Sequence, residues 1–487
     1  MKSSRMLWVL LGLLLLAPGL GCVDFEQEGV GFCEKRPGQC VPSIEDVVQE
    51  SAQPSGHISF RVTAKDGAAE RLAFKWEASI GTLETVRTTS TSSVVLWKSP
   101  ACLPMIQPGT VSVSVENSHG EVSKEFKVSV AACPKPTPTF PLTPTPSISS
   151  LGHHSLALSS IGLILRAWGA NESGQLGDGT VQGRTSPWML SIPGKVAAIS
   201  SGYGHSLALR DDGTVWAWGS NDYGQLGLGG GGAQTMPVQI PALGEIVSLS
   251  AGASHSLALG QNGTVWAWGS NDYGQLGDGA LTIRQSPMVV NLRNNVSGIA
   301  SLAAGWSYSM ALCYNGDVWV WGYDFSRMSP TPSGSHFPDK VYGLPGIVAI
   351  AAGRRHALAL SFDGTVWAWG NNDSGQLGLG GHGFQSSPKR IPGLSKIRAI
   401  AAGSDFSIAL GSQGEVWAWG LNVSGQMGDG TTSPRDVPAK VPGLAPVSFV
   451  AAGERHVSAM NSNGVFWTWG DDGVGGVRLS PERVSIP

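Results

Sequence analysis

The chain has 487 residues, of which 41% are hydrophobic and 14% are charged, and it contains 67 Gly, 30 Pro and 18 Trp. Because Gly and Pro interrupt helices and Trp favours pleated surfaces, this composition argues against a helical protein and predicts an all-β chain of two or three units. A net charge of −3 offers no basic face to nucleic acid, so we expect no nucleic-acid partner.

Residues 1–21 are predicted to be an export signal. Two basic residues precede an apolar run at residues 7–17, which is too short for a stable membrane span, and small residues stand before Cys22. The pattern resembles a bacterial lipoprotein signal, which implies cleavage before Cys22 and a lipid on its sulfur. Those signals usually have Leu where this chain has Gly19, so secretion after cleavage at the same bond is the alternative.

The cysteines are compatible with that export. Residues 22–54 contain three of the six, and if the first is lipidated an even set of four remains before the repeats, in an oxidising compartment. Cys313 stands alone in a predicted strand and is expected to be a small buried hydrophobic residue. Four cysteines allow three pairings, and the predicted disulfides are Cys33–Cys40 and Cys102–Cys133.

Residues 55–133 predict a small β-sandwich. Trp76 and the Val-rich last strands resemble immunoglobulin-like or polycystic-kidney-disease-like modules of bacterial surface proteins, which space or present another domain. Residues 134–147 are mostly Pro and Thr and predict a stiff spacer. Alternating short runs between turn residues predict the sandwich strands at residues 57–63, 72–78, 93–97, 110–116 and 125–130.

Residues 148–487 consist of seven copies of one repeat. The unit reads Ala-Ala-Gly-x-x-His-Ser-Leu-Ala-Leu, then a turn ending in Gly, then Val-Trp-Ala-Trp-Gly, then Gly-Gln-Leu-Gly, then Pro with a short apolar run. An atypical first copy begins near Ser149. The Gly that opens the other copies stands at residues 202, 252, 305, 353, 403 and 453.

Each copy predicts four short antiparallel strands, which the fifth copy places at residues 348–353, 356–360, 366–370 and 389–392. Asp363-Gly364 is a preferred hairpin dipeptide between the second and third. The fourth contains or borders Pro in every copy, which suits an outer edge strand. Without a helical period, this repetition predicts a seven-bladed β-propeller of four-stranded blades that follows the N-terminal sandwich.

The repeat resembles that of the regulator-of-chromosome-condensation family, whose members are seven-bladed propellers. The resemblance rests on Gly-Gln-Leu-Gly, which recurs in four copies, with Met427 in place of Leu in the sixth copy. It implies two function classes. One is a binding module similar to the family's secreted β-lactamase-inhibitory propeller. The other is nucleotide exchange on a small GTPase with chromatin attachment, against which the export signal and the lack of a basic tail argue.

Recurring Trp and His residues are predicted to be structural. Thirteen Trp lie in the Trp-x-Trp-Gly strands, and burying one removes about 150–250 Å² from water, so blade packing is favoured over a ligand role. A metal ring is the alternative for the histidines, but equivalent atoms of different blades lie too far apart to share one ion, and Tyr308 and Phe406 interrupt the series. We predict imidazoles bonded to neighbouring backbone, no metal and no cofactor. The histidines are His154, His205, His255, His356 and His456.

No catalytic constellation is predicted. The Asp-Gly turns invite comparison with sialidase propellers, which carry Ser-x-Asp-x-Gly-x-x-Trp boxes, but at residues 361–367 Asp and Gly are adjacent and the spacing fails. We find no Arg cluster, nucleophile–base pair or phosphate loop. We therefore expect a protein that is not an enzyme, with a sialidase-like glycosidase as a further alternative.

The candidate binding residues lie where otherwise similar copies differ. In antiparallel blades the loops after the first and third strands emerge at one end of the ring, which we call the end face. Aromatic and Arg residues, which are enriched in binding hot spots, gather there, although drift on a solvated rim is the alternative. The candidates are Tyr203, Tyr223, Tyr273, Trp306, Arg354, Arg355, Asp405 and Arg455.

The sequence thus predicts an exported monomer that is a binding module. It would be held at the bacterial outer membrane or cell surface by a lipid on Cys22, or else secreted. Through its end face it would bind an extracellular or envelope protein, or a glycan.

Overall fold

The structure is a computed structural model that describes residues 43–52, 57–65, 72–78, 82–98, 108–117, 120–129, 142–144, 147–159, 162–292, 296, 298–323 and 335–484. It divides into two compact units, Met1–Pro134 and Lys135–Pro487. The described residues form strands and no helix, so the all-β prediction is confirmed, and they include no helix that could cross a membrane. Outside the described residues lie the predicted export signal, Cys22, Cys33, Cys40, Cys102, Cys133 and most of the Pro- and Thr-rich segment.

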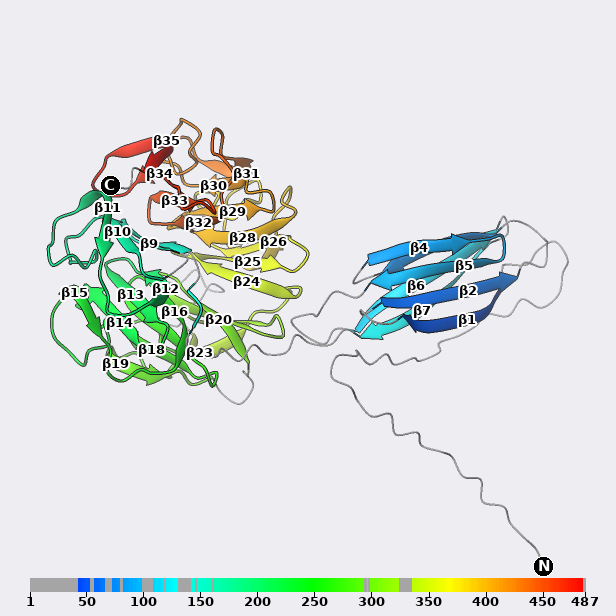
Figure 1. The fold of residues 1–487 in the computed structure, drawn as a ribbon, viewed down its shortest axis with the longest axis horizontal. Helices are drawn as coiled ribbons and strands as arrows, with labels where there is room; N and C mark the ends of the chain where they lie inside the picture. Colours follow the sequence, from blue (N-terminus) through cyan, green and yellow to red (C-terminus); the bar gives the residue numbers. More distant parts are fainter. Residues whose placement is uncertain are drawn as a thin grey trace, which may run out of the picture. The chain divides into compact units, whose positions relative to one another are not determined.

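The first unit contains two antiparallel sheets that share one core, with the strand orders β1-β2-β5-β4 and β3-β6-β7 (Figure 1). Phe60, Val95, Val113 and Phe126 are buried between the sheets, and Trp76 packs against them. The strands are β1 (Ser43–Ala52), β2 (His57–Lys65), β3 (Ala73–Ala78), β4 (Thr82–Thr88), β5 (Ser92–Lys98), β6 (Pro108–Asn117) and β7 (Gly120–Ser129).

The second unit contains seven four-stranded antiparallel sheets in its described part, each built from one continuous stretch of chain. Figure 1 shows them following one another around a centre, with the last sheet, in red, beside the first. The first strands are β8 (Ser147–Ser150), β12 (Val196–Ser201), β16 (Ile246–Ala251), β20 (Ile299–Ala304), β24 (Ile347–Ala352), β28 (Ile397–Ala402) and β32 (Phe449–Ala452). The second strands are β9 (His154–Leu158), β13 (His205–Arg210), β17 (His255–Gly260), β21 (Tyr308–Cys313), β25 (His356–Ser361), β29 (Phe406–Gly411) and β33 (His456–Met460).

The remaining strands complete each sheet outward. The third strands are β10 (Leu165–Gly169), β14 (Val215–Gly219), β18 (Val265–Gly269), β22 (Val318–Gly322), β26 (Val366–Gly370), β30 (Val416–Gly420) and β34 (Phe466–Asp471). The fourth strands are β11 (Arg184–Leu190), β15 (Gln234–Gln239), β19 (Arg284–Val289), β23 (Ser335–Lys340), β27 (Gln385–Arg390), β31 (Arg435–Lys440) and β35 (Val477–Val484). Every fourth strand contains Pro and pairs only with the third, as expected of an edge.

The position predicted for the fourth strand was wrong by several residues. In the fifth sheet β27 spans Gln385–Arg390, whereas the prediction was residues 389–392. The chain leaves the edge after Arg390 because Ile391 turns inward, where it is buried in the core. The short apolar run that suggested a strand is therefore the connection that packs beneath the sheet.

The Gly-Gln-Leu-Gly loop joins neighbouring sheets in the copies that contain it. Trp218 of β14 is buried in the core between the first and second sheets, and its Nε1 donates to the Gln175 carbonyl at 2.8 Å. The same bond recurs from Trp268, Trp419 and Trp469 to the Gln of the preceding loop. These four Trp residues are thus packing residues, and the Gln of the loop before each one holds it.

The recurring histidines also join sheets, but through side chains and not through backbone as predicted. His205 Nε2 lies 2.9 Å from Ser256 Oγ in the next sheet, and that hydroxyl donates to the Gln225 carbonyl, so the imidazole is the donor to the serine. Burial lowers the pKa of His205 to about 3 and keeps the ring neutral. The equivalent pairs are His154–Ser206, His255–Ser309, His356–Ser407 and His456–Ser155.

The last of those pairs closes the circle of sheets. His456 of the seventh sheet lies 2.9 Å from Ser155 of the first, and the Glu454 amide donates to the Gly152 carbonyl at 2.9 Å. Trp168 packs edge-on against Phe466, with ring centroids 5.9 Å apart. Within the described residues, the first and last sheets therefore meet through side chains and a backbone bond, and each sheet is built from its own strands.

Cys313 lies in β21 within the core shared by the third and fourth sheets. It is 3% exposed, and burial raises the pKa of its thiol to about 11. It is a packing residue, as predicted.

Candidate binding site on the end face

The end face is built on a ring of glycine corners. The backbone amide at one corner donates to a carbonyl at the corner of the next sheet, as from Gly152 to Gly202 at 3.2 Å. A Cβ at Gly202 would lie 2.3 Å from His205 Cε1, so only glycine fits. The loop after each third strand is tied to the same end, since the Ser220 amide donates to the Gly204 carbonyl at 2.8 Å. Both sets of loops therefore share one face.

Four of the candidate residues form a continuous row across this face. The rings of Tyr203 and Trp306 have centroids 5.1 Å apart. Arg354 Cζ lies 4.8 Å from the Trp306 ring centroid, and its Nη1 lies 3.8 Å from Asp405 Oδ2. These residues come from the second, fourth, fifth and sixth sheets. The third sheet has only Ala253 at its corner, which is small enough for the two aromatic rings to meet beside it.

The row is held in place but remains open to solvent. Tyr203 is 41% exposed and the Arg354 side chain 45% exposed. Asp405 is more enclosed, and its burial raises the pKa of the carboxyl although Arg354 acts in the opposite sense. Gln376 Nε2 donates to Asp405 Oδ1 at 3.3 Å. An exposed aromatic and guanidinium surface on a fixed backbone frame is suited to recognition.

A second group of candidates lies on the neighbouring loops. Tyr273 and Tyr323 meet edge-on with centroids 5.7 Å apart, and Arg355 Cζ lies 5.4 Å from the Tyr323 ring. Tyr323 carries this contact although only Tyr273 was selected from the sequence. Phe325, two residues farther along the same loop, lies outside the described residues.

Sequence reasoning missed a polar cluster beside Tyr203. His153 Nε2 lies 2.8 Å from Glu454 Oε2, and the two rings of His153 and Tyr203 have centroids 6.4 Å apart. The carboxylate raises the pKa of His153, while the imidazole lowers the pKa of Glu454. Arg455, which was selected, lies farther off, with its Nε 3.9 Å from Glu454 Oε1. The sequence could have indicated this cluster, because His153 and Glu454 both stand at corners where the copies differ.

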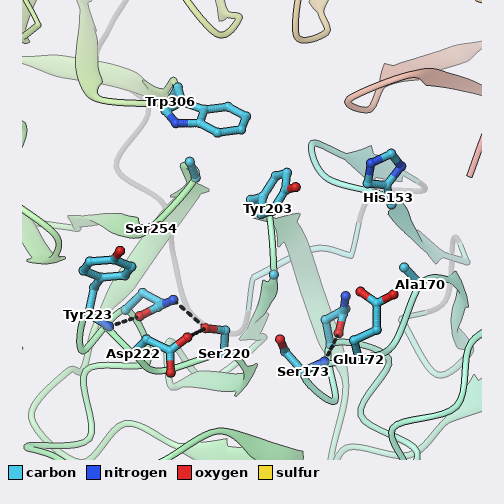
Figure 2. A pocket seen from close by; sticks show the side chains of 14 residues that line it. His153, Ala170, Glu172, Ser173, Tyr203, Ser220, Asp222, Tyr223, Ser254 and Trp306 are labelled. Atoms are coloured by element: carbon cyan, nitrogen blue, oxygen red, sulfur yellow. Dashed lines mark hydrogen bonds between the residues drawn. The ribbon is translucent and has the colours of Figure 1, made fainter. Parts of the chain in front are cut away.

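A pocket of about 400 Å³ opens beside this row (Figure 2). Tyr203, Tyr223 and Trp306 line it, whereas Tyr273, the arginines and Asp405 do not. In Figure 2, Tyr203 stands between Asp222 and Tyr223 on one side and Glu172 and His153 on the other. Its lining is His153, Ala170, Glu172, Ser173, Gln175, Tyr203, Gly204, Ser220, Asp222, Tyr223, Gln225, Ala253, Ser254 and Trp306.

No metal centre emerges from the part of the chain that the structure describes, where no group of three or more His, Cys, Asp or Glu could hold an ion. The recurring histidines direct Nε2 at serines of the next sheet, so each is engaged in joining sheets and not in a shared ligand set.

Family models match much of the second unit of the chain, and one of them begins within the first unit. The model for the RCC1-like domain matches residues 97–329. Two models for the Regulator of chromosome condensation (RCC1) repeat match residues 363–410 and 413–460, and residues 347–376 and 397–426. A human protein, the probable E3 ubiquitin-protein ligase HERC3, is 32% identical over 117 residues, which make up 24% of this chain and only 11% of the ligase.

Solved structures resemble about two thirds of the chain. Yeast RCC1 (Prp20), in a crystal structure with Kap60, is 26% identical with a TM-score of 0.59 over 69% of this chain and 85% of the yeast chain. A structure of Prp20p from Saccharomyces cerevisiae, reported with its binding to Gsp1p and histones, gives 26% and 0.59 over 68% and 87%. Human WBSCR16 is 24% identical with a TM-score of 0.58 over 66% and 95%, which shows the fold alone.

Proposed function

The repeats of this chain belong to the regulator of chromosome condensation (RCC1) family, and from that premise we propose that the protein is a non-enzymatic module that binds another protein through its end face. The seven sheets would form the blades of one closed propeller, and the two-sheet first unit would be an immunoglobulin-like sandwich that presents it.

One observation carries the proposal, namely the row of Tyr203, Trp306, Arg354 and Asp405 across the end face. Aromatic and Arg side chains contribute most to protein interfaces when they are positioned before binding, because little rotamer freedom is then lost. Here the Tyr203 and Trp306 rings contact each other, and Arg354 is placed between Trp306 and Asp405. The yeast relative seen with Kap60 supports a protein as the partner class.

The row can be tested as a hot spot. Trp306→Ala and Arg354→Ala should each weaken binding of a captured partner by about thirtyfold, or about 2 kcal/mol, since truncating a central aromatic or Arg anchor has that effect. The measurement is the Kd for the partner isolated with the full chain as bait.

Two controls separate binding from stability. Asp212 and Asp363 lie in hairpins between second and third strands, at the opposite end from the row, where each carboxylate accepts from a Thr two residues on. Asp212→Asn should leave the Kd unchanged. Trp369→Ala should lower the free energy of unfolding by about 3–5 kcal/mol without a specific effect on binding. Full affinity in both row variants with loss at the hairpins would place the site on the other end.

The proposal includes a compartment. The basic start, short apolar run and small residues before Cys22 support export with a lipid on that cysteine, and Cys33–Cys40 and Cys102–Cys133 would then be disulfides. The partner would be an extracellular or envelope protein. A lipid anchor at one end and a recognition face on a separate unit are compatible with display at a cell surface.

A further inference from the structure

The pocket beside the row has a mainly negative lining, in which the one imidazole, that of His153, is paired with Glu454. None of its fourteen lining residues is Lys or Arg, whereas two are the carboxylates Glu172 and Asp222, and three are the aromatic rings of Tyr203, Tyr223 and Trp306. Aromatic faces carry negative potential, and carboxylates add formal charge. Such a lining attracts a cation and repels an anion.

These two carboxylates differ from others in the same loops. Asp178, Asp278 and Asp472 each accept from an Arg six residues on, at distances of 2.6, 2.7 and 2.9 Å. Within the described residues, Glu172 and Asp222 form no ion pair with Lys or Arg, and Asp222 Oδ2 accepts only from Ser220 Oγ at 3.1 Å. Their charge is left available to a ligand.

Building on the proposed function, we propose that this pocket receives an arginine side chain of the partner protein, with its guanidinium on the rings of Tyr203 and Tyr223 and between the carboxylates of Glu172 and Asp222. A guanidinium is planar, stacks on aromatic rings and donates in two directions, which a pocket with carboxylates from two loops can use. A volume of about 400 Å³ suits one long side chain and is near the lower end of small-ligand sites.

The probe for this site is N-acetyl-arginine methylamide, compared with the neutral isostere N-acetyl-citrulline methylamide. Saturation-transfer NMR with the full chain should give at least about tenfold tighter binding for the arginine compound, and the difference should shrink in high salt. The double substitution Glu172→Gln with Asp222→Asn should abolish the difference.

Asp272→Asn is the matched control. Asp272 occupies the position of Asp222 in the next copy but does not line the pocket, so its removal should leave the preference for arginine intact. Equal binding of the two compounds, or an arginine preference that survives the double substitution, would overturn the proposal.

The combined results distinguish a failure of the cation pocket alone from a failure of the protein-binding function. If Trp306→Ala and Arg354→Ala weaken partner binding while the arginine compound shows no preference, the cation pocket is wrong and the protein-binding face stands. If the arginine compound binds through the two carboxylates while no row substitution affects any partner, the pocket serves a free cationic ligand and both the protein-binding function and the partner's arginine are wrong.

Discussion

At the start of the second strands, residue identities in successive sheets depend on one another. Each His in this position has a Ser opposite it in the next sheet. Where Phe406 replaces His, the equivalent residue of the next sheet is Val457, which lies in the same core. Where Tyr308 does so it is Ala357, also in the same core, and the Tyr hydroxyl donates to the His356 carbonyl at 2.5 Å. The chain thus pairs a donor with an acceptor, and an apolar ring with an apolar neighbour.

This dependence predicts a compensating pair of substitutions. Ser256→Val should lower the free energy of unfolding by about 1–3 kcal/mol, because the buried Nε2–H of His205 loses its acceptor. Adding His205→Phe should recover most of that loss, since Phe406 and Val457 already occupy the equivalent places, with the ring against Gly403 as His205 lies against Gly202. Urea denaturation of both single variants and the double variant measures the coupling. Additive losses would contradict it.

Among elements, the Gly-Gln-Leu-Gly loop explains why the repeat is so recognisable. Its Gln carbonyl accepts from a Trp and from a Ser of the next sheet, as Gln376 does from Trp419 and Ser407. Its second Gly has positive φ and lies against that Trp. The loop of one sheet therefore positions the buried Trp of the next sheet. A substitution in the loop should affect the packing of both sheets.

The second Gly can be tested against a nearby one. Gly378 has φ +68°, and a Cβ there would lie 2.9 Å from Trp419 Nε1; Gly380 has φ +76° but its nearest neighbour is 3.6 Å away. Both Ala substitutions impose left-handed strain of about 1–2 kcal/mol. Gly378→Ala should destabilise further, because Trp419 must move. Equal free energies of unfolding for the two variants would refute a packing role for the loop.

Strands were predicted correctly where the sequence pattern recurs in the repeats, and were missed where apolar and polar residues do not alternate clearly. β1 and β4 were not predicted. Both lie at edges of their sheet, and their sequences, such as that of Ser43–Ala52, mix apolar and polar residues without a regular alternation. The repeat fixed every third strand because Trp-x-Trp-Gly is unmistakable. It misplaced β27 because an inward connection and an edge strand have similar hydrophobic content.

The whole molecule should be sensitive to acid. Burial lowers the pKa of His154, His205, His255 and His356 to about 3, and that of His456 to about 4. In the unfolded chain these histidines have a pKa near 6.5. Below that pH the unfolded state therefore binds protons that the folded state does not bind. The stability contributed by these five histidines should be fully present above pH 6.5, whereas that of His153, whose pKa Glu454 raises, is lost as the pH rises.

Below pH 6.5 the free energy of unfolding should fall by up to about 1.4 kcal/mol per histidine for each pH unit. Urea midpoints at pH 7.5 and pH 5 measure the effect. The variant His205→Phe with Ser256→Val should lose less stability over that interval than the unsubstituted chain. A urea midpoint that does not change with pH would show that the buried imidazoles do not join the sheets in their neutral form.

The candidate site could be predicted only in part at this scale. The sequence indicated which corners vary, and so Tyr203, Trp306 and Arg354 were selected. It could not show that Tyr203 and Trp306 meet beside Ala253, nor that Glu172 and Asp222 flank one pocket, because these relations depend on how separate sheets are packed around the centre.

Each sheet of the second unit is built from four consecutive strands. The chain could therefore begin at a different sheet without changing which sheets are neighbours. Fourth strands run to the next first strand through short connections, such as residues 191–195, 240–245 and 391–396. A linker of comparable length from residue 484 to residue 147 would make the seam between the last and first sheets equivalent to the other connections. Circular permutation at any of them should then preserve the recognition face while moving the point at which the rest of the chain is attached.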